Sequence, residues 1–114
     1  MKQNKSVLII FPSLILSCLF LSGELFAYKI SDLKKLRDTK ICIKCDLSGA
    51  NLQYTNLSET NLNMANLNMA NLYKVNLQYT NLSETNLNNA NLRHSDLTGA
   101  DLTGANLNKA KLTG

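Results

Sequence analysis

Residues 51–63 read NLQYTNLSETNLN, and the three leucines in this stretch stand five residues apart. The same spacing holds without exception for fourteen leucines, from Leu47 to Leu112. An α-helix buries residues three and four apart and a β-strand buries every second residue, so neither buries a strict five-residue series on one straight face. The period therefore predicts a solenoid, in which each repeat adds one short segment to a coil.

Each leucine is preceded by a small residue and then Asn or Asp, and it is followed by two variable positions, as in ANLQY (residues 50–54) and ADLTG (residues 100–104). This pattern resembles the pentapeptide-repeat family, whose consensus is A-(D/N)-L-x-x. The resemblance covers Asp46 to Gly114, with small departures at Cys45, Val75 and Lys111. It implies an all-β fold, a right-handed quadrilateral β-helix with four repeats to a coil. Fourteen repeats then give about three and a half coils. The number of sides comes from the resemblance, because the five-residue spacing alone does not distinguish four sides from three.

In that fold each leucine fills the axis, and the small residue two positions before it also points inward. Several of these small residues carry hydroxyl groups. A buried hydroxyl must find a hydrogen-bond partner, so we expect each one to reach a backbone group. The residues concerned are Thr55, Thr60, Thr80, Thr85 and Ser95.

The segment before the repeats begins like a secretory signal peptide. Two lysines, Lys2 and Lys5, precede an almost wholly apolar run from Val7 to Leu21. We expect residues 1–27 to be the signal peptide, with cleavage after Ala27 and a periplasmic or secreted mature protein. The alternative is an uncleaved membrane anchor, which is disfavoured because the run is shorter than the ~20 residues of a spanning helix and contains Pro12.

Residues 28–45 are expected to form an N-terminal cap segment that covers the open edge of the first coil. A short helix is predicted with Ser31 as its N-cap and an apolar edge from Ile30, Leu33 and Leu36. The segment resembles the short helix that precedes a C-x-x-C pair in many exported family members. At the other end the repeats stay in register to Gly114, so the C-terminal coil is either a site for end-to-end homodimerisation or a half coil that frays.

Removal of the signal peptide would leave one cysteine pair, Cys42 and Cys45. A zinc site is disfavoured because there is no second pair, and a redox site because such motifs work from the start of a helix. Reading the period backwards places Cys42 at a leucine position and Cys45 at a small-residue position. Both are therefore expected to point inward, as small core residues or as a disulfide.

Residues 51–63 recur identically as residues 76–88, an offset of five repeats. On a four-sided coil the two copies fall on adjacent sides, so recent duplication explains them better than selection for a ligand ladder. One side instead collects aromatic and cationic residues more densely than any other. We expect it to be a protein-contact face, since Tyr and Arg are favoured at interfaces, although these side chains could simply cover backbone. The face consists of Tyr54, Tyr73, Lys74, Arg93 and His94.

Charge limits the classes of function. From Asp46 onward four basic residues oppose five acidic ones, for a net charge of −1, whereas residues 28–45 carry +4. A nearly neutral rod disfavours both nucleic-acid binding and the acidic mimicry of DNA used by gyrase-protecting family members. With one histidine and no serine placed beside a base, no catalytic, cofactor or metal site is predicted.

The sequence therefore predicts an exported bacterial scaffold or protein-binding rod without enzymatic activity, acting on an unknown protein partner. Contact with a membrane is expected only if the signal peptide stays uncleaved. The alternatives are a DNA-mimicking regulator of the gyrase-protecting kind and a secreted effector that acts on a host protein.

Overall fold

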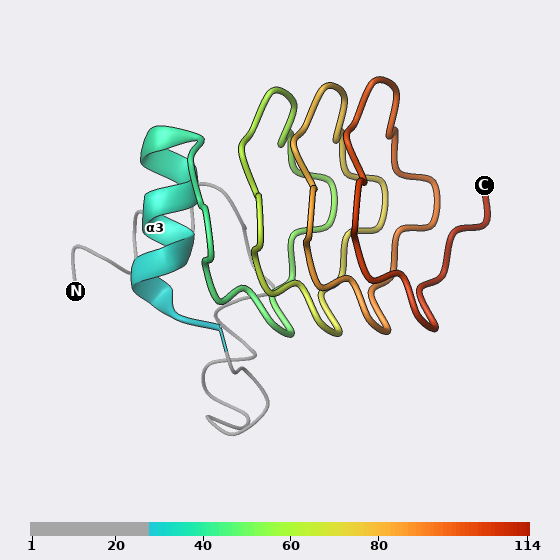
Figure 1. The fold of residues 1–114 in the computed structure, drawn as a ribbon, viewed down its shortest axis with the longest axis horizontal. Helices are drawn as coiled ribbons and strands as arrows, with labels where there is room; N and C mark the ends of the chain where they lie inside the picture. Colours follow the sequence, from blue (N-terminus) through green and yellow to red (C-terminus); the bar gives the residue numbers. More distant parts are fainter. Residues whose placement is uncertain (1–27) are drawn as a thin grey trace.

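The computed structural model describes residues 28–114, which form one short helix and a stack of coils (Figure 1). The helix, α3 (Ile30–Thr39), covers one end of the stack. The predicted signal peptide, its cleavage after Ala27 and the alternative membrane anchor fall on residues 1–27, outside the described residues. Within residues 28–114 no helix is long and apolar enough to span a membrane.

The coils have four sides, as predicted. Parallel bridges join residues that lie 20 positions apart, such as Asn51 to Asn71 and Asn71 to Asn91, and 20 residues make four pentapeptides. Each bridge carries two backbone hydrogen bonds: Leu52 donates its N–H to the Asn71 carbonyl at 2.9 Å, and Asn71 donates to the Ala50 carbonyl at 2.9 Å. The β-structure thus consists of short bridges between coils rather than extended strands.

The leucines fill the axis of the stack. From Leu47 to Leu92 every repeat leucine is buried, and the small residues between them are buried as well. All five inward hydroxyls donate to backbone carbonyls, as expected; Thr80 Oγ1, for example, reaches the Leu57 carbonyl at 2.8 Å. The core is therefore apolar along its axis, with its few polar groups satisfied.

A tight turn separates each side from the next. Ala65 donates its N–H to the Leu62 carbonyl at 3.0 Å, and the intervening Met64 has φ 59°. An i to i+3 bond with positive φ at the third residue is characteristic of a type II turn. The Asn or Asp before each leucine supports this turn with its side chain: Asn61 Oδ1, for example, accepts from the Asn63 N–H at 3.1 Å. This role explains the preference for Asn and Asp at that position.

The cap differs in part from the expectation. Helix α3 begins two residues earlier than predicted, with Lys29 as its N-cap and no side-chain cap bond, so the assignment of Ser31 was wrong. The reason is that Lys29 is extended and donates its N–H to the Asp46 carbonyl at 3.0 Å, which ties it to the first coil. Leu33 is buried as expected, but Ile30 is 36% exposed and does not belong to the buried edge.

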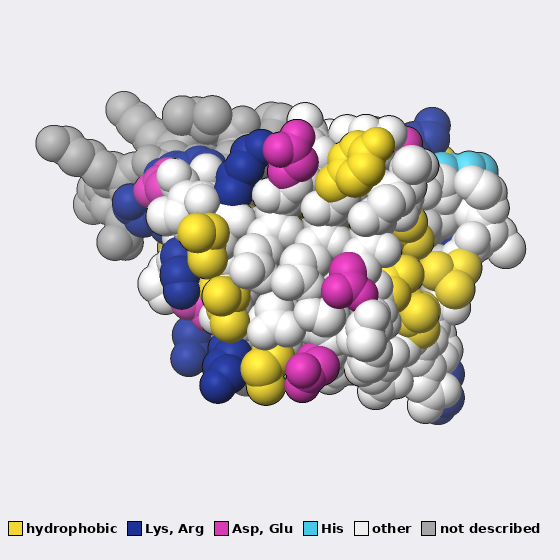
Figure 2. All heavy atoms as spheres, turned by 45° about the horizontal axis from the view of Figure 1, so that its top comes forward, with side chains coloured by type: hydrophobic (Ala, Val, Ile, Leu, Met, Phe, Trp, Pro, Cys, Tyr) yellow, Lys and Arg dark blue, Asp and Glu magenta, His cyan; other side chains and the backbone are white. Residues whose placement is uncertain are grey.

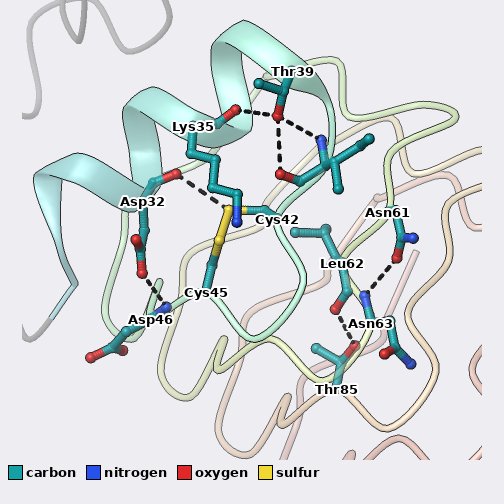
Figure 3. Close-up of a disulfide and its surroundings, with 11 residues drawn as sticks. Asp32, Lys35, Thr39, Cys42, Cys45, Asp46, Asn61, Leu62, Asn63 and Thr85 are labelled. Carbon is teal, nitrogen blue, oxygen red and sulfur yellow. Dashed lines mark hydrogen bonds between the residues drawn. A yellow bond between two sulfur atoms is a disulfide. The ribbon is translucent and has the colours of Figure 1, made fainter.

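A disulfide joins Cys42 and Cys45 where the cap meets the first coil (Figure 3). Their Cα atoms are 5.3 Å apart, and both residues are buried. The two cysteines lie where the five-residue period places them, with Cys42 at a leucine position and Cys45 at a small-residue position. The pair closes the start of the first coil under α3.

The last coil is less well covered than the others. Leu97, Leu102 and Leu107 are only partly buried, and Leu112 is 52% exposed. Homodimerisation through this coil stays a prediction.

Candidate protein-contact surface

The residues predicted to form a contact face do lie on one side of the stack. We call this side the aromatic side and define it by the repeats centred on Leu52, Leu72, Leu92 and Leu112. Bridges from Asn51 to Asn71, from Asn71 to Asn91 and from Asn91 to Lys111 hold these repeats in register.

Three rings form a column across successive coils of the aromatic side. Tyr54 and Tyr73 have ring centroids 5.7 Å apart and planes at 88°, and Tyr73 and His94 have centroids 5.5 Å apart, also at 88°. Such edge-to-face pairs contribute about 0.5–1.5 kcal/mol beyond burial. The Lys74 ammonium lies 5.5 Å from the centroid of the Tyr73 ring, within the range of a cation–π contact. Each ring is thus fixed by its neighbours.

Most of this column is open to solvent. Tyr54 is 66% exposed, and Lys74, Arg93 and His94 are exposed as well, whereas Tyr73 at the centre is half-buried. Covering of the backbone accounts for Tyr73. Tyr54 is as exposed as its duplicate Tyr79 and differs from it in its ring contact with Tyr73. The arrangement places two phenol rings, one imidazole and the cations Lys74 and Arg93 together on this side, with the Arg93 guanidinium bonded to Asn91 Oδ1 at 3.0 Å.

The aromatic side carries no carboxylate. Its charged residues are Lys74, Arg93 and Lys111, with His94 beside them. The acidic residues of the repeats lie on the other three sides: Asp46, Glu59, Glu84, Asp96 and Asp101. The repeats therefore have a net charge near zero overall, but one of their four sides carries only positive charges.

Charge also varies along the rod. In the view of Figure 2, which shows one face, Lys and Arg side chains gather mainly toward the α3 end, whereas Asp and Glu are spread over the coils. At that end Asp38 pairs with Lys34 (2.7 Å) and with Arg37. Hydrogen bonds from Arg37 and Lys34 hold the pKa of the Asp38 carboxyl well below its usual range.

A pocket of about 390 Å³ adjoins the aromatic side at the α3 end. It lies between the last turn of α3 and the first coil, and Tyr54 belongs to both the pocket and the ring column. Sequence reasoning missed it because the pocket depends on how the helix crosses the coil. It is lined by Leu36, Arg37, Lys40, Tyr54, Thr55, Asn56, Leu57 and Thr60.

Residues 28–114 contain no group of three or more His, Cys, Asp or Glu side chains that could hold a metal ion. The exposed carboxylates Asp96 and Asp101 have pKa values lowered by hydrogen bonds from the hydroxyl and N–H groups of Thr98 and Thr103. These bonds are part of the turn structure.

The model for pentapeptide repeats matches residues 41–78 and 76–114, with 8 copies of the repeat. The chain belongs to the pentapeptide-repeat family. Among solved structures it is similar to the pentapeptide-repeat protein Rfr23 from the cyanobacterium Cyanothece 51142, at 43% identity over 63% of this chain and a TM-score of 0.62. The chain spans about half of that protein, covering 49% of its length.

Two further pentapeptide-repeat structures are more distant in shape. The protein alr5209 from Nostoc PCC 7120 is 30% identical, over 77% of this chain and 78% of its own, with a TM-score of 0.45. A protein from the Arabidopsis thaliana thylakoid lumen is 31% identical, over 60% of this chain and 51% of its own, with a TM-score of 0.37. A comparison with curated protein sequences found no significant match. Pentapeptide-repeat proteins generally act as structural or binding proteins.

Proposed function

We propose that the chain is an exported, non-enzymatic rod that binds another protein through its aromatic side. The observation that carries this proposal is the exposed column of Tyr54, Tyr73 and His94 on a side with cations and no carboxylate. Aromatic and arginine side chains dominate the energy of protein interfaces. Because the rings are fixed by stacked coils, they lose little conformational freedom on binding, which favours affinity.

The cationic aromatic side also bears on the choice between partners. A DNA mimic needs an acidic surface along the rod, and the most distinctive side of this rod carries the opposite charge. With only three cations spread over the aromatic side, a continuous contact with a phosphate backbone is not supported either. A protein surface that offers carboxylates and apolar groups matches this side best.

Export is part of the proposal. The basic and apolar pattern of residues 1–27 and the disulfide between Cys42 and Cys45 both suit an oxidising compartment such as the periplasm. Mass spectrometry of protein from the native host tests this. We expect a chain that begins near Tyr28 and has no free thiol, and an intact chain from Met1 in the cytosol would contradict it.

Binding is tested by affinity capture from a periplasmic extract with a tagged chain. Tyr73→Ala combined with Arg93→Ala should abolish capture of the partner. Because Tyr73→Ala also removes two edge-to-face ring pairs, its thermal melt by circular dichroism should shift downward, and capture is therefore measured well below the melting temperature of the variant. The pair Gln78→Ala and Thr98→Ala, on a neighbouring side, is the control and should keep the partner. Equal loss from both pairs would contradict the assignment of the contact to the aromatic side.

A further inference from the structure

The cap closes only two of the four sides of the first coil. At Asp46 it is complete: the N–H donates to Asp32 Oδ2 at 2.8 Å (Figure 3), and the carbonyl accepts from the Lys29 N–H at 3.0 Å. At Ile41 the Thr39 hydroxyl accepts from the Ile41 N–H at 3.1 Å, and it shares its single proton between the Lys35 carbonyl at 2.8 Å and the Ile41 carbonyl at 3.0 Å. These bonds replace those that a preceding coil would make.

The equivalent positions on the other two sides are Asn51 and Asn56. In the next coil the matching residues are paired, with the Asn71 N–H bonded to the Ala50 carbonyl at 2.9 Å and the Asn76 N–H bonded to the Thr55 carbonyl at 3.0 Å. Within residues 28–114, no group bonds to the backbone N–H or carbonyl of Asn51 or Asn56. By the repeat geometry these four groups point toward the α3 end. They form an uncovered edge of the kind that pairs with another chain.

The pocket lies beside this edge and includes Asn56 in its lining. Its apolar surface comes from Leu36 and Leu57, which are almost fully buried, and from the exposed ring of Tyr54. The pocket can therefore receive an apolar side chain from a segment that runs along the edge. Its volume of about 390 Å³ leaves room for such a side chain together with part of the segment that carries it.

The charge at the pocket is positive. Arg37 and Lys40 line it and no Asp or Glu does, but Arg37 is paired with Asp38, so the uncompensated charge at the pocket is that of Lys40. The Lys40 ammonium contacts only the Ser58 carbonyl, at 3.4 Å, and has no carboxylate partner among the described residues. A segment that carries carboxylates next to an apolar residue would complement this charge.

We infer that this edge and pocket dock an extended acidic segment of the partner protein. Its main chain pairs with Asn56 as an added rung of the coil, an apolar side chain enters the pocket, and a carboxylate meets Lys40. This is strand addition, in which backbone bonds give affinity and side-chain pockets give specificity. The inference rests on the proposed function, because it assigns the chemistry of the same partner where the aromatic side ends at Tyr54.

Amide hydrogen exchange measured by NMR tests whether the edge is open. In the chain alone, the amides of Asn51 and Asn56 should exchange at least about tenfold faster than those of Asn71 and Asn76, which are bonded between coils. If Asn56 were as protected as Asn76, the chain itself would already cover the edge. That result would overturn the inference.

Binding is measured by the fluorescence anisotropy of a labelled peptide of about ten alternating Glu and Val residues, which can add as a strand. The peptide should bind and should protect the Asn56 amide. Lys40→Gln should weaken binding about fivefold, the upper range for an exposed ion pair. Lys44→Gln is the matched control, because Lys44 also has positive φ and lies outside the pocket, and it should leave binding unchanged.

Two modified peptides complete the test. A peptide with alternate N-methyl groups, which cannot pair along an edge, should not bind, and neither should a Lys and Val peptide. Absence of binding by the acidic peptide, equal binding by the basic one, or equal loss from the Lys40 and Lys44 variants would overturn the inference. If the inference fails while capture still depends on Tyr73 and Arg93, the proposed function stands. If the acidic peptide binds but capture of the partner does not depend on Tyr73 and Arg93, the inference about the edge stands and the assignment of the contact to the aromatic side is wrong.

Discussion

Replacing Leu82 by alanine should destabilise the rod strongly. Leu82 is 0% exposed in the middle of the stack, and its own side places Leu62 on one coil and Leu102 on the next. Truncation removes three buried carbon atoms and leaves a cavity that the hydrogen-bonded coils above and below cannot collapse to fill. We expect a loss of about 3 kcal/mol in the free energy of unfolding, as for leucine-to-alanine changes in rigid cores. Urea denaturation followed by circular dichroism measures it.

The control is the same substitution at the edge of the stack. Leu112 occupies the same repeat position but is 52% exposed, so Leu112→Ala should cost less than about 1 kcal/mol. The two variants differ only in the depth of the leucine. If both lowered the free energy of unfolding equally, the assignment of the leucine position to the axis of the stack would be wrong.

Three further predictions concern the disulfide, a turn and pH. Reduction of the Cys42–Cys45 disulfide should lower the free energy of unfolding by about 2 kcal/mol, a modest loss because the loop is short, and urea midpoints with and without dithiothreitol measure it. Gly99→Ala should cost about 1–2 kcal/mol because Gly99 has φ 69°, and its new Cβ would lie 2.6 Å from the Tyr79 ring, so the NMR shifts of that ring should change. The hydrogen bonds from Thr103 lower the pKa of Asp101 below its ordinary value of 3.8, so their contribution to stability is present above that pH and is lost as the pH falls through the folded pKa. Thr103→Val should therefore make the urea midpoint fall less steeply below about pH 4 than it does in the wild type.

The fold could be predicted almost completely from the sequence because one spacing constrains every repeat. The leucine period fixed which residues point inward, including Cys42 and Cys45, which lie where the register places them. The number of sides could not be predicted from the spacing in the same way. Five-residue spacing is compatible with three or four sides, so that number rested on the family resemblance until the bridges from Asn51 to Asn71 and onward established it.

The cap was predicted less well because local capping rules compete there with tertiary contacts. Ser31 is a favourable N-cap residue, but the bond from Lys29 to Asp46 ties the chain to the coil two residues earlier, and the helix begins directly after Lys29. The asymmetric cover of the first coil could not be anticipated, since it depends on where α3 lies across the coil. The pocket beside Asn56 follows from that placement.

Grouping of the surface residues was predictable once four sides were assumed, whereas their contacts were not. Sequence register placed Tyr54, Tyr73 and His94 on one side, but edge-to-face packing depends on side-chain rotamers that a repeat pattern does not specify. The absence of carboxylates on this side was available in the sequence. The net charge of the repeats does not reveal it, because the acidic residues on the other three sides offset the cations of this one.

The central claim, that the aromatic side contacts a partner protein, is tested most directly by comparing Tyr54→Ala with Tyr79→Ala in partner capture. The two tyrosines sit in identical local sequences and are equally open, at 66% and 65% exposed, but they lie on adjacent sides of the rod. We predict that Tyr54→Ala weakens capture strongly and that Tyr79→Ala leaves it intact, whereas the two variants have similar thermal melts. Undiminished capture by Tyr54→Ala, or equal loss from both variants, would contradict it.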